Sequence, residues 1–262
     1  MQLHRIVAGH YWTDSGAFMG VLPYTVWHDK IKVDERQRVR LELNLLLIQT
    51  EGRNILVDTG LGNRFYGRQR DIYNPSDFLV PENLHKLGLS CSDITDVILT
   101  HLHFDHAGGI VTQIEGKDEL TFPQAIHWIQ AEEWQMAKQP DSLNRAAYKY
   151  EHQLALLDQI GKIKLIEGDS EPYKNVFIKL VRGHTVGSQA VEVQTETAYY
   201  SYAGDIIPTR FHTVLPVISA YDVSRTQTWQ AKNDLYDRLR AKGGILLLNH
   251  ETDDWQVPIA SL

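Results

Sequence analysis

Five short apolar segments of the chain each end in a histidine or an aspartate. "DVILT" is followed by His101 and His103, "VFIKLVRG" by His184, "AYYSYAG" by Asp205, "ILLLN" by His250 and "NILV" by Asp58. Apolar runs of this length, bounded by glycine or turn residues, are typical of buried β-strands. Because ligands collect at the carboxyl ends of strands in layered α/β folds, we expect these side chains to meet at one edge.

The decapeptide "THLHFDHAGG" is the densest of these strand ends. It places four ligand-type side chains within six residues: His101, His103, Asp105 and His106. Its first two histidines point to the same side of an extended chain, whereas residues two apart on a helix diverge by about 200°. The other two come one turn later and face a neighbouring position. Gly108 and Gly109 would permit the sharp turn and the close backbone approach that this loop requires.

The remaining strand ends supply partners for both pairs. His184 can complete the first pair, His250 can complete the second, and the carboxylate of Asp205 can bridge the two. A set of histidine and aspartate ligands without a thiolate suits Zn²⁺, Mn²⁺ or Fe²⁺. The spacing therefore predicts a metal site that is built from separate strands.

The composition narrows the class of partner. The chain has 262 residues, a net charge of −7 and one cysteine, and no stretch approaches the roughly 18 apolar residues of a membrane span. This balance disfavours a nucleic-acid or membrane-surface binder and favours a small-molecule substrate. A single cysteine and the lack of a secretory signal predict a cytoplasmic protein without disulfides.

Strands come in runs along the chain, with helices grouped between them. Helical patterns cover residues 81–90, 131–139, 143–161 and 228–244, and residues 61–80 have no clean period and are expected to form a surface loop. This order favours two sheets covered by helices over a strictly alternating parallel barrel. The aromatic-rich amino-terminal region and the 61–80 loop are candidates for a homodimer contact.

Five motifs, in this order, resemble those of the metallo-β-lactamase superfamily: "VDTG", "THLHFDHAGG", "GHTVGSQ", "AGD" and "NHE". The resemblance runs from about residue 20 to the end of the chain. It implies an α+β fold, the four-layer αββα sandwich, in which two mixed β-sheets are flanked by helices. Residues 1–262 are then expected to form a single domain of this type.

The resemblance also implies roles for the strand-end residues. It assigns one divalent ion to His101, His103 and His184, a second to Asp105, His106 and His250, and a bridging role to Asp205. Zn²⁺ is the expected metal, with Mn²⁺ and Fe²⁺ as alternatives. Asp58 is similar to the family's buried aspartate, which orders the motif loop from behind the ligands. A hydroxide between the metals would attack the substrate, and Asp105 would orient it and carry a proton to the leaving group.

Within the family, the chain looks like the compact lactonase-like branch, which predicts a dinuclear hydrolase acting on a small ester or lactone. Acyl-homoserine lactonases, however, place a tyrosine three residues after the bridging aspartate, where this chain has Pro208. Tyr202 and His212 are therefore candidates for the substrate pocket. The alternatives are a phosphodiester or phosphotriester hydrolase that uses the same metals and a non-catalytic metal-binding sensor module.

Overall fold

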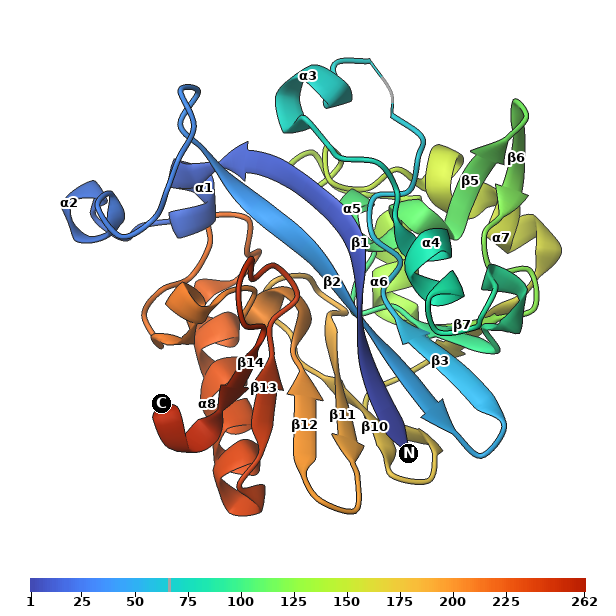
Figure 1. Cartoon of the computed structure of the whole chain (residues 1–262). Helices are drawn as coiled ribbons and strands as arrows, with labels where there is room; N and C mark the ends of the chain where they lie inside the picture. The colour runs from blue at the N-terminus through green and yellow to red at the C-terminus, as the bar shows by residue number, and fades with distance from the viewer. Residues whose placement is uncertain (66) are drawn as a thin grey trace.

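The computed structural model describes residues 1–65 and 67–262. Its frame is two six-stranded sheets that lie against each other (Figure 1). The first sheet has the strand order β1-β2-β3-β4-β7-β8. Its strands are β1 (Gln2–Asp14), β2 (Arg38–Thr50), β3 (Arg53–Val57), β4 (Asp96–Ile98), β7 (Ile126–Gln130) and β8 (Ile163–Ile166). Antiparallel pairing joins β1, β2 and β3, and parallel pairing joins the rest, so the sheet is mixed.

The second sheet has the order β14-β13-β12-β11-β10-β9, and only its β12–β13 pair is parallel. Its strands are β9 (Ser170–Tyr173), β10 (Val176–Leu180), β11 (Gln189–Gln194), β12 (Tyr199–Tyr202), β13 (Ile245–Leu247) and β14 (Gln256–Pro258). A separate hairpin, β5 (Val111–Ile114) and β6 (Lys117–Leu120), stands apart from both sheets.

Helices cover the outer faces of the two sheets. The long α8 packs outside the second sheet, and α4, α6 and α7 lie on the side of the first (Figure 1). The helices are α1 (Ser15–Met19), α2 (Tyr24–Trp27), α3 (Gln69–Tyr73), α4 (Val80–His85), α5 (Phe104–Ala107), α6 (Ala131–Lys138), α7 (Ala155–Ile160) and α8 (Arg225–Lys242).

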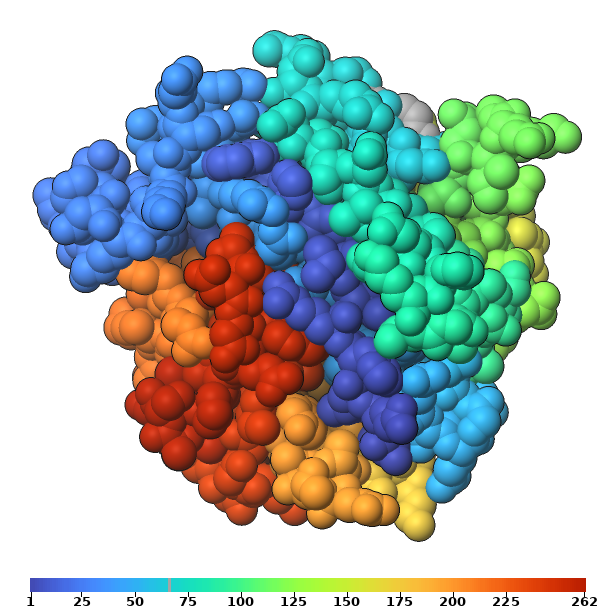
Figure 2. Space-filling view, in the orientation of Figure 1, coloured from blue at the N-terminus to red at the C-terminus, as the bar shows by residue number. Residues whose placement is uncertain are grey.

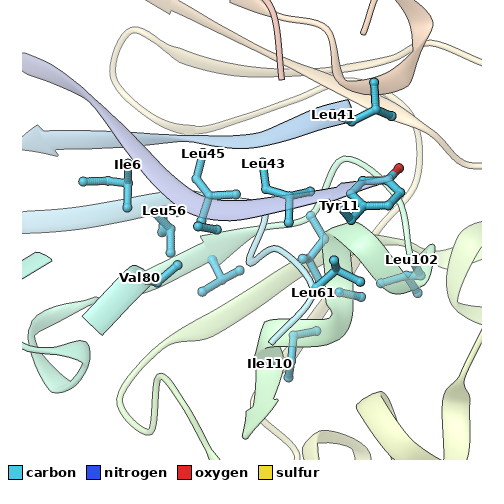
Figure 3. Close-up of a cluster of buried hydrophobic side chains, with 14 of the residues drawn as sticks. Ile6, Tyr11, Leu41, Leu43, Leu45, Leu56, Leu61, Val80, Leu102 and Ile110 are labelled. Atoms are coloured by element: carbon cyan, nitrogen blue, oxygen red, sulfur yellow. The ribbon is translucent and has the colours of Figure 1, made fainter. Parts of the chain in front are cut away.

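Three apolar layers hold these four structural layers together. Leu46 and Ile48 of β2 face the second sheet, whereas Leu45 and Leu47 of the same strand face the helices. A strand that is buried on both faces reads as a continuous apolar run, which explains "LNLLLIQT". Figure 3 shows part of the layer between the first sheet and its helices, and α8 encloses the third layer against the second sheet. The predicted α+β, αββα fold class is confirmed; the single-domain assignment stays a prediction.

The helix predicted over residues 143–161 is wrong in its first half. The chain makes turns there, and helical structure begins with a π-helical turn at Tyr150–Leu154 that continues into α7. The carboxylate of Asp141 accepts the backbone N–H groups of Leu143 and Asn144, and the Ala147 carbonyl accepts the N–H of Phe104. The Asp141 contacts would also suit the first turn of a helix, but the Ala147 carbonyl, which a continuing helix would need, is engaged by Phe104, so tertiary structure overrides helical propensity.

The amino-terminal strand closes one face of the molecule beside the C-terminal residues. Figure 2 shows β1 running between the C-terminal segment and the region of α4. The guanidinium of Arg5 donates to the carbonyl of Asp253 across this contact. No helix in the described residues is both long enough and apolar enough to cross a membrane.

Candidate metal centre

The strand ends that the sequence singled out meet at one edge of the two sheets. His101 and His103 follow β4, Asp105 and His106 lie on the short helix α5, His184 lies between β10 and β11, Asp205 follows β12, and His250 follows β13. All seven side chains are largely buried. The fold thus brings together residues that are up to 149 positions apart in the sequence.

The seven residues fall into two groups whose ligand atoms lie within 4.8 Å of one another. The first group is His101, His103 and His184, and its three ring centroids are 4.5–4.8 Å apart. The second group is Asp105, His106, Asp205 and His250. The two expected sets of three residues thus lie in separate groups, with Asp205 counted in the second; their role as metal ligands stays a prediction.

Asp205 lies between the groups and faces both. Its Oδ1 lies 3.2 Å from Nε2 of His106 and 3.2 Å from Nε2 of His250, whereas its Oδ2 lies 3.5 Å from Nε2 of His184. The amide of Asn249 donates to Oδ1 and fixes the carboxylate in this orientation. One carboxylate therefore presents a separate oxygen to each group.

Three of the histidines form a hydrogen bond through Nδ1, the ring nitrogen that does not face the other members of the two groups. The Nδ1 of His106 lies 2.8 Å from Asp58 Oδ2, that of His250 lies 2.8 Å from the Glu42 carbonyl, and that of His184 lies 2.8 Å from Asp222 Oδ1. Each acceptor requires a proton on Nδ1 and so leaves the lone pair on Nε2. Asp58 also accepts the Thr100 N–H at 2.7 Å, at the start of the motif loop.

The donor set fits metal ions. The buried Nε2 atoms of His101, His103, His106 and His250 make no hydrogen bond within the described part of the chain, even where a carboxylate oxygen lies 3.2 Å away. Buried polar atoms nearly always have partners, so four orphans in one place require an explanation. Imidazole and carboxylate ligands without a thiolate are the donors expected for Zn²⁺ and similar cations.

The charge states of His101, His103 and Asp205 agree with this interpretation. Burial, together with the neighbouring histidines, holds the pKa of His101 and of His103 well below the usual value, so both rings are neutral at pH 7. Burial alone would raise the pKa of Asp205, but His250, His106 and His184 outweigh it and hold that pKa well below the usual value. Neutral imidazoles and an ionised carboxylate are the forms that bind metals. For His106 and His184 burial is outweighed by nearby carboxylates, which raise the pKa of both rings, so these two would have to release a proton to bind a metal.

Gly108 and Gly109 are required by close backbone contact rather than by the sharp turn expected from the sequence. A Cβ on Gly108 would lie 2.3 Å from the Leu61 carbonyl oxygen, and one on Gly109 would lie 2.1 Å from that of Thr59. The backbone of Gly108 is in the ordinary helical region. The glycines therefore let the ligand loop pack on the loop after β3, and the turn itself does not demand them.

Two buried carboxylates of the site, Glu133 and Asp222, could not be recognised from the sequence. Glu133 of α6 accepts the N–H of Leu102 at 3.0 Å and the N–H of Gly187 at 3.1 Å, so it ties together the two loops that carry the first group. Asp222 accepts from His184 and from the Thr228 hydroxyl. Neither residue lies in a ligand-like motif. The sequence signal for Glu133 is limited to its place in the acidic first turn of the predicted helix 131–139.

A cavity of about 600 Å³ opens onto the metal centre and is lined in part by His103, Asp105, His184 and Asp205. Its walls are mainly aromatic and small apolar side chains, among them Tyr11, Tyr73, Phe104 and Tyr221. The further carboxylates at the cavity are Asp141 and Asp222, and none of the described lining residues is a lysine or an arginine. The cavity therefore suits an uncharged molecule with an apolar part.

Tyr202 and His212 do not line this cavity, which corrects the pocket role expected for them. The Tyr202 hydroxyl donates to the Asn44 carbonyl at 2.7 Å and lies 3.2 Å from Asp58. The two ring nitrogens of His212 lie 2.8 Å from the Thr209 hydroxyl and 3.1 Å from the Phe18 carbonyl. Both side chains are buried and hydrogen-bonded to groups away from the cavity. Tyr11 and Tyr221 line the cavity instead.

Fold and site together define a four-layer αββα protein with a cluster of histidines and aspartates, able to hold metal ions, at one edge of its sheets. The chain belongs to the metallo-β-lactamase superfamily, whose family model matches residues 41–250. The family expected from the motifs is thus confirmed.

Proteins with similar sequences include a lactonase and a probable metallo-hydrolase. The chain is 30% identical over 162 residues to an N-acyl homoserine lactonase of Bacillus thuringiensis, and the match covers 57% of each protein. It is 27% identical over 194 residues to a probable metallo-hydrolase of Mycobacterium tuberculosis, covering 64% of this chain and 57% of that protein. The matches thus span little more than half the length of these curated relatives.

Solved structures match over nearly the whole chain. A probable metal-dependent hydrolase from Staphylococcus aureus superposes with a TM-score of 0.92 at 26% identity, covering 99% of this chain and 92% of that one. A dizinc quorum-quenching lactonase in complex with a product superposes with a TM-score of 0.77 at 21% identity, covering 98% and 89%. At that identity the second match speaks for the fold alone.

Proposed function

We propose that the chain is a dinuclear metal-dependent hydrolase that cleaves an uncharged small ester or lactone. His101, His103 and His184 hold one divalent cation, Asp105, His106 and His250 hold a second, and Asp205 bridges them. Zn²⁺ is the proposed metal. The observation that carries the dinuclear proposal is the placement of Asp205, whose two oxygens face different ligand groups at 3.2 and 3.5 Å.

Two bound cations would lower the pKa of a water molecule and polarise the carbonyl oxygen of the substrate. The side chains around them have their own tasks. Asp105 lines the cavity, where its carboxylate can take the proton of the attacking water and deliver it to the leaving oxygen. In the reaction a bond forms between the water oxygen and the carbonyl carbon, the C–O ester bond breaks, and the alcohol oxygen receives the proton.

The walls of the cavity support an uncharged substrate. Apart from the two proposed cations, the described lining residues offer no positive charge to an anion, and Asp141 and Asp222 add negative charge to the cavity wall. A phosphodiester is therefore disfavoured, whereas a phosphotriester, which has no charge, remains a second candidate. The similarity to lactonases and metallo-hydrolases supports the ester or lactone.

A substrate panel tests this proposal. Metal-loaded protein is assayed on uncharged γ- and δ-lactones, aryl esters, an aryl phosphotriester and an aryl phosphodiester, with metal content measured on the same samples. We expect the lactones or esters to give the highest kcat/KM and the phosphodiester the lowest. Because the metals contribute several kcal/mol of transition-state stabilisation, chelation should lower the best rate by at least about 10³-fold.

Two outcomes would reject parts of the proposal. If the phosphodiester is turned over fastest, the assignment of an uncharged substrate is wrong. If two ions are bound and no compound on the panel turns over, the metal-binding sensor module becomes the better account.

A further inference from the structure

The amino-terminal strand changes its inward-facing side halfway along. Val7 pairs with Asn44 of β2 and His10 pairs with Glu42, so β1 has one residue more than β2 across this step. This is a β-bulge, and it reverses which residues of the strand face inward. Before it the even-numbered Ile6 and Ala8 are in the core, and after it the odd-numbered Tyr11 is in the same apolar layer.

Glycine makes this bulge possible. Gly9 has φ of +136°, and a Cβ there would lie 2.4 Å from the Ser76 hydroxyl and 2.8 Å from the Asp77 carbonyl oxygen. The segment after α3 satisfies the backbone that the bulge frees: Ser76 N–H donates to the His10 carbonyl, and the Ser76 hydroxyl accepts the His10 N–H. Bulges beside functional sites often redirect a side chain.

The side chain redirected by this bulge is Tyr11. Figure 3 shows its ring at one end of the apolar cluster, with the hydroxyl oxygen pointing out of it. The hydroxyl donates to Asp105 Oδ2 at 2.7 Å in a buried contact. Asp105 Oδ2 also lies 3.5 Å from Nε2 of His250. Tyr11 therefore contacts the Asp105 oxygen that faces another member of the second group. The ring packs edge-on against Phe104 and His250, which restricts its orientation.

We propose that Tyr11 is a positioning residue for the second metal ion. Its phenol fixes Asp105 Oδ2 in the direction of His106 and His250, and the glycine bulge in β1 exists to deliver that phenol. The inference rests on the proposed function, because it requires two bound ions. It also assigns a task to the first strand, which lies outside the matched residues 41–250.

The test is the site-selective loss of metal from Tyr11→Phe. Wild type and variant are loaded with Zn²⁺, dialysed against a series of chelator concentrations, and analysed for zinc per chain. Removing an outer hydrogen-bond partner of a metal ligand typically costs about 10–100-fold in metal affinity. We expect the zinc content of Tyr11→Phe to fall from two ions per chain to one at a chelator concentration about 10–100-fold lower than for wild type. The remaining ion should be lost at the same concentration as in wild type.

Tyr73→Phe is the matched control, because it removes a phenol from the wall of the same cavity and leaves the contact with Asp105 intact. It should retain zinc like wild type. In an Asp105→Asn background Tyr11→Phe should cause no further loss, since Tyr11 acts through that carboxylate. A thermal melt of metal-free Tyr11→Phe verifies that the variant folds.

The outcomes separate the inference from its premise. Wild type that never binds more than one ion overturns the proposed function. If wild type binds two ions and Tyr11→Phe loses them at the same chelator concentration, the positioning role is wrong. Equal loss of both ions from a folded variant would also contradict it, because that result indicates a general structural effect.

Discussion

At the scale of single residues, the metal centre depends on carboxylates that hold the ligands from behind. Asp58, Asp222 and Glu133 are nearly fully buried, and each accepts hydrogen bonds from a ligand or from the backbone beside one. An ionised acceptor forms stronger hydrogen bonds than a neutral one, and a buried donor left without it is costly. The geometry of the ligands therefore depends on residues that themselves bind no metal.

Glu133→Gln tests this dependence. The amide offers one acceptor oxygen where the carboxylate has two, so the N–H of Leu102 or of Gly187 loses its partner. We expect the unfolding free energy to fall by about 1–3 kcal/mol, measured by urea denaturation. The loops of Leu102 and Gly187 both carry residues of the first group. The ion proposed for that group should therefore be lost at a chelator concentration about tenfold lower than in wild type.

Glu132→Gln is the control for this substitution. Glu132 is next to Glu133 in the sequence, but its side chain is exposed and pairs with Arg182 at the surface, where ion pairs contribute little to stability. It should behave like wild type in both measurements. Metal retention in Glu133→Gln equal to that of Glu132→Gln would show that Glu133 does not position the first group.

The clustering of the seven histidines and aspartates could be predicted from the sequence far better than the residues that hold them in place. The seven ligand positions follow apolar strands, and strand ends converge by the topology of layered sheets. Asp222 and Glu133 have no such signature, because their roles depend on contacts 38 and 31 positions away. Tyr11 was missed for another reason: without the bulge at Gly9, a period of two places its side chain on the opposite face of the strand.

At the scale of elements, long apolar strands were predictable and the connections were not. β2, which spans Arg38–Thr50, is recognisable in the sequence because a doubly buried strand leaves a nearly continuous apolar run. Residues 143–149 have helical propensity, yet they form turns against the ligand loop. The 61–80 region was expected as a loop and contains the short helix α3, which the irregular pattern did not indicate.

Helix α8 anchors the segment that follows Asp205. The amine of Lys232 is fully buried and donates to the carbonyls of His212 and Val217. Burial lowers the pKa of Lys232 to about 8, although Asp222 opposes the shift. Between pH 8 and the ordinary lysine value of 10.5, the unfolded chain then binds a proton that the folded chain has released. Stability should therefore rise with pH across this window.

Urea denaturation of metal-free protein at pH 7.5, 8.5 and 9.5 measures this effect. We expect the unfolding free energy of wild type, relative to Lys232→Met, to increase with pH, since the variant lacks the titrating amine. Lys242→Met, at the exposed end of the same helix, should follow wild type. A difference between wild type and Lys232→Met that is constant with pH would show that the buried amine keeps its ordinary pKa.

At the scale of the whole molecule, the layered core and the site are two results of one arrangement. Two sheets pack face to face through one apolar layer, and helices enclose a second and a third. This packing leaves the carboxyl ends of β3, β4, β12 and β13 along one edge, where the polar residues that end each strand meet. The buried histidines at that edge are tolerable because metal ions would complete their coordination.

Anomalous diffraction at the zinc absorption edge, on crystals of the zinc-loaded chain, tests the two-metal centre most directly. We expect two peaks about 3.5–4 Å apart, as in other two-metal sites. One peak should lie at bonding distance from His101, His103 and His184, the other from Asp105, His106 and His250, with Asp205 touching both. A single peak, or two peaks on other residues, would contradict the proposed two-metal centre.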